Sequence, residues 1–223
     1  AALKGWIIHQ DKSVIVLNKP PGLPVQGGTR SERNLDAILA AAADKFGGRP
    51  LLVHRLDRDT SGVILVAKEE HTHRELSMQF ETRKVFKEYL AITAGVLDRD
   101  SDYIERRIGH HPIDRVKMAV TDDEDEGKEA CTYYEVIERF RGFCSLKILP
   151  KTGRTHQIRV HLAHAGAPVL CDKQYGGRSQ LTRGELWRDP ADQTVLLARQ
   201  ALHAHRIAFS HPGTGQRLQI EAP

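Results

Sequence analysis

A dense cluster of ionisable side chains runs directly into a wholly apolar segment in the first third of the chain. Five ionisable residues occupy the six positions 54–59, and residues 63–67 read Val-Ile-Leu-Val-Ala. Because charges are costly to bury, we expect the charged segment to form a loop at the edge of a sheet. The apolar run is short enough to be a buried strand. Together they predict a polar loop held on a rigid strand.

Most of the remaining regular structure is predicted as short strands. The expected strands are 6–9, 14–17, 85–93, 103–107, 116–120, 131–137, 143–149, 201–209 and 217–221. Apolar residues at helical spacing predict helices at 35–46, 70–82 and 155–165. Many strands with few helices favour an α+β fold with a mixed, largely antiparallel sheet and flanking helices over a doubly wound parallel sheet.

Composition limits the class of protein without naming a function. The 223 residues carry a formal net charge of +4, which permits an anionic partner without requiring one. No apolar stretch is long enough to span a bilayer and no leader segment opens the chain, so neither membrane insertion nor secretion is expected. Cys131, Cys144 and Cys171 lack CxxC spacing, which disfavours a disulfide framework and a thiolate zinc site and points to a reducing, cytoplasmic location.

Two polar segments are predicted to lie at the surface. The acidic run 122–126 is expected to be a solvated hairpin tip, because five adjacent like charges repel one another in any packed setting. Residues 178–192 are polar and are expected to form an irregular surface excursion. No internal repeat and no long linker divides the chain, so we expect one domain over residues 1–223.

A second segment with unusual chemistry spans residues 151–164, Lys-Thr-Gly-Arg-Thr-His-Gln-Ile-Arg-Val-His-Leu-Ala-His. In the predicted helix, His156 and Arg159 share one face with Ala163. Free amides at the helix start, with Lys151, Arg154 and Arg159, would suit an anion such as phosphate. Simpler alternatives remain for both segments: a basic, solvated helix here, and an ordinary ion-paired turn at 54–62.

The sequence HRLDRDTSG at 54–62 and the sequence KTGRTHQIRVHLAHAGAP at 151–168 resemble the signature segments of the RluA-like family of RNA pseudouridine synthases. Further similar segments follow in the same order, at 18–22, 87–89, 127–134, 172–176, 202–205 and 211–212. The resemblance implies a single catalytic domain of two subdomains around a central RNA-binding cleft. Many relatives carry a small N-terminal RNA-binding domain, and none is visible here. Cys171 stands where glycine is common, which could alter a tight turn.

The resemblance also implies an enzyme, an isomerase that flips a uridine out of structured ribosomal or transfer RNA and converts it to pseudouridine. Asp57 looks like the family's catalytic aspartate, and Arg159 looks like the arginine that pairs with its carboxylate. Tyr89 corresponds to the tyrosine that stacks under the flipped base. Arg55 resembles the side chain that fills the gap left in the base stack when the nucleotide flips out. Leu202 is expected to supply an apolar wall of the site. Further RNA contacts are expected from Lys19, Arg58, Lys87, Arg115, Lys117, Lys151, Arg154 and His156.

Elementary chemistry agrees with these expectations. The isomerisation has no net redox change and no group donor, so neither cofactor nor metal is expected. Burial alone would protonate a carboxylate, whereas a buried arginine favours its charged form, so Asp57 and Arg159 make a chemically sensible pair. The alternatives are a non-catalytic RNA-binding module and, prompted by twelve histidines, a metal-dependent hydrolase. A monomer is the simplest oligomeric state.

Overall fold

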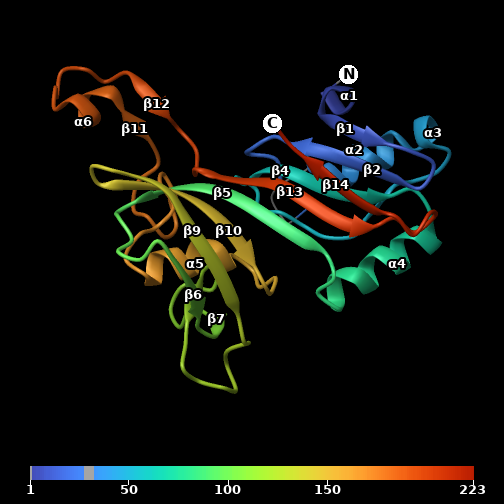
Figure 1. Ribbon diagram of the computed structural model, residues 1–223. Coiled ribbons are helices and arrows are strands. Elements are labelled where there is room, and N and C mark those ends of the chain that lie inside the picture. The colour runs from blue at the N-terminus through green and yellow to red at the C-terminus, as the bar shows by residue number, and fades with distance from the viewer. Residues whose placement is uncertain (1, 28–32) are drawn as a thin grey trace. The chain divides into compact units, whose positions relative to one another are not determined.

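The computed structural model describes residues 2–27 and 33–223 of the chain. The fold divides into two compact units. Unit 1 holds the described residues up to Glu88 together with His203–Pro223, and unit 2 is Tyr89–Leu202. Figure 1 labels most of the helices and strands of the two units.

Unit 1 is a mixed sheet with helices packed beside it. Its elements are α1 (Ala2–Trp6), β1 (Ile7–Gln10), β2 (Val14–Lys19), α2 (Leu35–Ala41), α3 (Ala43–Phe46), β3 (Leu51–Leu52), β4 (Ser61–Ala67), α4 (Glu70–Glu81), β13 (Leu202–Ser210, in this unit from His203) and β14 (Arg217–Glu221). The strand order is β1-β2-β4-β13, with β14 beside β13 and β3 beside β4. Strand β4 is antiparallel to β2 and parallel to β13. One parallel pair among antiparallel neighbours makes the sheet mixed.

Strand β4 is the centre of the unit 1 core. All seven of its residues are buried, as the apolar run in the sequence predicts. Helix α4 packs against it through buried Leu76 and partly buried Phe80. The predicted helix at 35–46 forms as two pieces separated at Ala42, with the Asn34 side chain accepting from the Ala37 N–H at its start. Gly47, with φ of 74°, ends it in the left-handed conformation that glycine adopts without strain.

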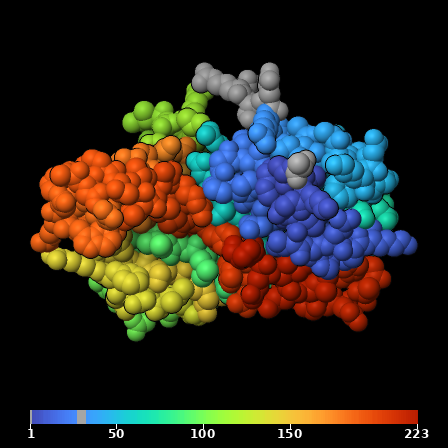
Figure 2. All heavy atoms as spheres, turned by 90° about the horizontal axis from the view of Figure 1, so that it is seen from above, coloured from blue at the N-terminus to red at the C-terminus, as the bar shows by residue number. Residues whose placement is uncertain are grey.

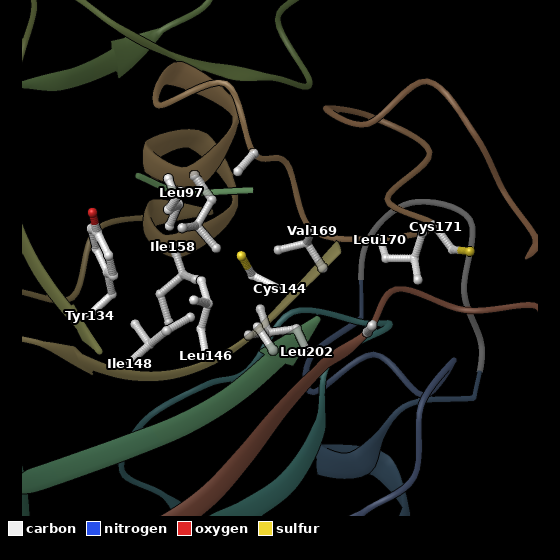
Figure 3. Close-up of a cluster of buried hydrophobic side chains, with 14 of the residues drawn as sticks. Leu97, Tyr134, Cys144, Leu146, Ile148, Ile158, Val169, Leu170, Cys171 and Leu202 are labelled. Carbon is white, nitrogen blue, oxygen red and sulfur yellow. The ribbon is translucent and has the colours of Figure 1, made fainter. Parts of the chain in front are cut away.

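Unit 2 is an antiparallel sheet covered on one face by a helix (Figure 1). Its elements are β5 (Phe86–Ala94, in this unit from Tyr89), β6 (Ser101–Glu105), β7 (Ile108–His110), β8 (Met118–Val120), β9 (Cys131–Phe140), β10 (Phe143–Pro150), α5 (Gln157–His164), β11 (Leu181–Thr182), α6 (Arg183–Trp187) and β12 (Val195–Leu197). The strand order is β5-β10-β9-β6. Figure 3 shows the core between sheet and helix, where Leu146 and Ile148 of β10 meet Ile158 of α5.

Two predictions for unit 2 need correction. The helix predicted at 155–165 begins at Gln157, because His156 has φ of 56° and lies outside it. Segment 178–192 is not irregular, since it contains β11 and α6. Thr182 and Glu185 form a reciprocal capping box at the start of α6, a Thr-x-x-Glu pattern that was legible in the sequence. Figure 2 shows this segment, in orange, at the surface.

Other surface and composition features are as follows. The acidic run 122–126 is exposed, as predicted. It is not a hairpin tip, because the flanking strands pair elsewhere, β8 with β7 and β9 with β10 and β6. Cys131, Cys144 and Cys171 keep their thiol groups and are not in disulfide bonds. Across residues 2–27 and 33–223, none of the helices has both the length and the apolar character needed to cross a membrane.

Candidate active site

The loop that carries Asp57 lies between β3 and β4 in unit 1. The backbone carbonyl of Asp57 accepts a hydrogen bond from the Thr60 N–H at 3.1 Å, which closes a turn one residue before β4 begins at Ser61. The Asp57 side chain is half-buried. The tight turn and the buried strand after it therefore present this carboxylate from a rigid frame.

His54 fastens the start of this loop to the sheet. Its Nε2 accepts a hydrogen bond from the Leu65 backbone N–H at 2.8 Å, and its ring stacks on Phe80 with centroids 4.5 Å apart. Burial, with a smaller contribution from the positive charge of Lys87, lowers the pKa of His54 to about 3. The imidazole is therefore neutral near pH 7, which matches its role as an acceptor.

Lys19 holds the loop that carries Asp57 through backbone carbonyl groups. The prediction that Lys19 contacts RNA from the rim of a cleft is wrong. The side chain is fully buried rather than on an RNA-facing rim. Its Nζ donates hydrogen bonds of 2.9 Å to the carbonyl oxygens of Pro20, Leu23 and Arg58. An ammonium has three N–H donors, so these bonds satisfy it inside the protein. Lys19 holds the Asp57 loop in place and does not meet RNA phosphate from a surface.

Arg159 is the corresponding buried charge of unit 2. It lies on α5, is only 5% exposed, and makes two hydrogen bonds to the Asp172 carboxylate. Because it is buried in this way, it does not join Lys151 in a solvent-facing anion site at the helix start. Helix α5 is also not a basic, solvated helix, since all of residues 157–162 are buried.

A buried polar network explains most of the remaining polar residues of the 151–164 segment. Thr152 Oγ1 donates to Gln157 Oε1 at 2.6 Å, and Gln157 Nε2 donates to Thr132 Oγ1 at 3.0 Å. Thr132 also bonds His161 Nδ1 at 2.8 Å, and His161 Nε2 lies 2.9 Å from the Arg106 carbonyl oxygen. Burial lowers the pKa of His161. These side chains join α5 to β9, a role that the sequence analysis missed because buried glutamine and histidine carry no pattern of their own.

Three more predicted site residues lie within or beside the cores. Tyr89 on β5 is half-buried, stands opposite Ile148, and packs against the unit 2 core. Leu202 is a buried member of that core (Figure 3). Lys87 is half-buried in unit 1, and burial, with the nearby Arg83 charge, lowers its pKa.

The predicted RNA-contacting cations differ in how far they are exposed. Arg55, Arg58, Arg115 and Lys151 are exposed, and Arg58 lies 3.6 Å from Asp59. Lys117 is half-buried and pairs with Asp114. Arg154 is half-buried and its Nε donates to the Glu129 carbonyl oxygen at 2.9 Å. His156 Nδ1 lies 2.6 Å from the Tyr175 hydroxyl oxygen.

The predicted catalytic residues thus fall in both units, with Asp57 in unit 1 and Tyr89 and Arg159 in unit 2. Within unit 2 the structure brings together Arg159, Asp172, Tyr175 and His156. In the described part of the chain, no group of three or more His, Cys, Asp or Glu side chains is arranged to hold a metal ion.

Comparisons with known proteins identify the family. The family model described as RNA pseudouridylate synthase matches residues 13–164. A ribosomal large subunit pseudouridine synthase D from Pseudomonas aeruginosa is 39% identical over 97% of this chain and 67% of its own length. An uncharacterised RNA pseudouridine synthase from Bacillus subtilis is 37% identical, over 97% of this chain and 68% of its own length. The chain therefore spans about two thirds of the length of these curated relatives.

A solved structure supports the same conclusion. The human RNA pseudouridylate synthase domain containing 4 covers 100% of this chain and 89% of its own, with a TM-score of 0.82 and 28% identity. The human domain containing 1 shares the fold, with a TM-score of 0.74 and 24% identity over 97% of this chain and 82% of its own. On the family match and these relatives, this chain belongs to the RNA pseudouridylate synthase family.

Proposed function

We propose that this chain converts uridine to pseudouridine in the RNA of the large ribosomal subunit, with Asp57 as its catalytic carboxylate. The observation that carries the proposal is the 39% identity, over 97% of the chain, to a relative named ribosomal large subunit pseudouridine synthase D. Two more relatives of that name, from Xanthomonas campestris and Haemophilus ducreyi, are 38% and 37% identical. Transfer RNA is the competing substrate.

The proposed reaction breaks one bond and forms one bond at the same sugar carbon. The C1′–N1 glycosidic bond is cleaved, the uracil turns while it stays in the site, and C1′ bonds to C5. C5 loses its proton and N1 gains one, so the atoms balance without an oxidant or a donor. Asp57 is proposed to act as nucleophile or base, and Tyr89 to stack against the uracil ring.

The structure of the Asp57 loop supports this role. Lys19 and His54 hold the loop from inside through backbone groups, at the Arg58 carbonyl oxygen and the Leu65 N–H. These bonds hold the backbone that carries the Asp57 carboxylate in a fixed position. Arg159 is proposed to supply the positive charge that keeps the Asp57 carboxylate ionised.

Exposed cations are proposed to bind the RNA. Arg55 is exposed two residues before Asp57, and we propose that it occupies the gap left when the target nucleotide leaves its stack. Arg58 and Lys151 are proposed to contact phosphates, so affinity should fall as salt rises. We also propose that the enzyme acts as a monomer in the cytoplasm, where its cysteine thiols would stay reduced.

The test is to incubate the chain with transcripts of large-subunit ribosomal RNA and, separately, with transfer RNA, and to map pseudouridine by chemical labelling. We expect product in the ribosomal transcript, loss of product in Asp57→Asn, and RNA affinity in that variant within a few fold of the original. Asp59→Asn is the matched control, because Asp59 lies in the same loop and is partly exposed beside Arg58. Activity that persists in Asp57→Asn contradicts the catalytic assignment, and product in transfer RNA alone contradicts the substrate.

A non-catalytic RNA-binding module is the competing function. It would bind the same transcripts through the same exposed cations and leave every uridine unchanged. RNA binding by the original chain without any pseudouridine in either RNA therefore favours this alternative over the proposal.

A further inference from the structure

The guanidinium of Arg159 is held along one edge by two side chains of unit 2. Its Nε donates to Asp172 Oδ2 at 2.6 Å, and its Nη2 donates to Asp172 Oδ1 at 2.9 Å. Nη2 also donates to Gln174 Oε1 at 2.6 Å. The Arg159 and Asp172 side chains are 6% and 1% exposed, so this bidentate pair is shielded from solvent.

The Asp172 carboxylate is itself fixed by the loop that carries it. Its Oδ1 accepts hydrogen bonds from the backbone N–H groups of Gln174 at 3.0 Å and Tyr175 at 3.3 Å. The loop is closed by the Gly176 N–H, which donates to the Asp172 carbonyl oxygen at 2.8 Å. A Cβ on Gly176 would lie 3.0 Å from that oxygen, so the turn is tightly packed. The carboxylate is therefore oriented by its own loop as well as by Arg159.

Tyr175 restrains the flat face of the same guanidinium. The centre of its ring lies 4.9 Å from Arg159 Cζ. The Tyr175 hydroxyl oxygen accepts the Met118 backbone N–H at 2.9 Å and lies 2.6 Å from His156 Nδ1. An aromatic ring on the face and a carboxylate on the edge together leave the guanidinium little freedom to rotate.

We propose that Asp172 is a positioning residue of the reaction, which acts by setting the orientation and charge environment of Arg159. This inference rests on the proposed function, in which Arg159 keeps the catalytic carboxylate ionised. Asp172 and Gln174 hold the Nε and Nη2 edge of Arg159, and Tyr175 lies against its face.

The first test compares Asp172→Asn with the original chain in the pseudouridine assay across pH. Asparagine keeps the shape of aspartate, removes its charge, and turns one N–H toward the N–H groups of Arg159. We expect kcat to fall about 10- to 100-fold with KM within about threefold. We also expect the acidic limb of the kcat profile to move to higher pH, because a displaced Arg159 stabilises the ionised carboxylate less. A variant that is merely less folded would lose active enzyme without moving the pH profile.

The second test reads the position of Arg159 without using activity. Phenylglyoxal modifies accessible arginines, and mass spectrometry reports which ones react. We expect Arg159 to be protected in the original chain and to react at least fivefold faster in Asp172→Asn. Asp102→Asn is the matched control, since it removes an aspartate from an exposed pair with Arg99 in the same unit. It should leave both the pH profile and the protection of Arg159 unchanged.

These two readouts separate the inference from the proposed function. If Arg159 stays protected and the pH profile is unchanged in Asp172→Asn, the positioning role is wrong even though the enzyme makes pseudouridine. If Arg159 is released in the variant but the original chain modifies neither RNA, the arginine is positioned as inferred and the proposed function is wrong.

Discussion

Replacement of Gly62 by alanine tests how closely β4 and β13 must approach beside the Asp57 loop. Gly62 has φ of +114°, and it pairs with Ala204 in the parallel register of these strands. A Cβ built on Gly62 would lie 2.1 Å from the Ala204 carbonyl oxygen and 2.7 Å from its carbonyl carbon and nitrogen. All three atoms belong to the backbone, so no side-chain rotation can relieve the contact.

The magnitude follows from the distance that the strands must move. Carbon and oxygen atoms in close contact lie about 3.3 Å apart, so the strands must separate by about 1 Å at this point. Overpacking of this kind costs about 1–3 kcal/mol. A φ that only glycine adopts readily adds about 1–3 kcal/mol. We therefore expect the free energy of unfolding to fall by about 4 kcal/mol, which lowers Tm by about 8–16 °C in a chain of this size.

Thermal and urea unfolding followed by circular dichroism measure this loss. Gly142→Ala is the matched control, because Gly142 also has a positive φ, +81°, but no atom lies within 4 Å of the added Cβ. The control should lose only the conformational cost, about 1–2 kcal/mol. If Gly62→Ala and Gly142→Ala lower the free energy of unfolding equally, the close approach of β4 and β13 is not what requires glycine at position 62.

Four further predictions concern the buried polar groups and one strained turn. Lys19→Met leaves the carbonyl oxygens that Lys19 Nζ bonds without their donor, so urea unfolding should show a loss of about 3 kcal/mol or more. The pKa of His54 is about 3 in the folded chain and about 6.5 in the unfolded chain. The neutral ring's contribution to the free energy of unfolding is therefore complete above pH 6.5 and is lost as pH falls toward 3. Between pH 5.5 and 4.5 the original chain should lose about 1.3 kcal/mol more than His54→Gln, measured by urea unfolding at each pH. Thr152→Val removes a donor to Gln157 and an acceptor for the Cys131 N–H, and calorimetry should show a loss of about 1–3 kcal/mol. Cys171 has φ of 60°, where a β-branched side chain is most strained, so Cys171→Val should be about 2 kcal/mol less stable than Cys171→Gly in the same measurement.

The strand and helix patterns that dominate the fold were predictable from the sequence. Residues 63–67 form the fully buried part of β4, and the 70–82 pattern forms α4 with Leu76 inward, because apolar spacing reports which face is buried. The start of α5 was not predictable, since nothing in the residue type of His156 indicates a φ of 56°. At Cys171, by contrast, the difference from the family's common glycine did point to a feature of the backbone. Its positive φ is the conformation in which the family's common glycine would be unstrained.

The site was predictable in its residues and less so in their roles. A lysine is seldom fully buried, so Lys19 was predicted on a surface. Its burial depends on carbonyl oxygens from two separate stretches, near Leu23 and at Arg58, which no local pattern brings together. In the same way, Asp172 lies 13 residues from Arg159, and only the folded chain makes it that arginine's bidentate partner.

The two segments that mark this family therefore combine two kinds of residue that look alike in a sequence. In the first, His54 bonds the backbone of β4 through a neutral ring, while Asp57, three residues later, is the proposed catalytic group. In the second segment, Gln157 hydrogen-bonds Thr132 and so joins α5 to β9, while Arg159, two residues later, donates to Asp172. A carboxylate and a guanidinium can each be held in one position only by a rigid surrounding. Here the polar side chains next to them are hydrogen-bonded to backbone groups or to buried hydroxyl groups. Many polar residues are therefore needed in these segments to hold one charge in one position. Loss of a positioning residue should then lower turnover with little effect on RNA affinity.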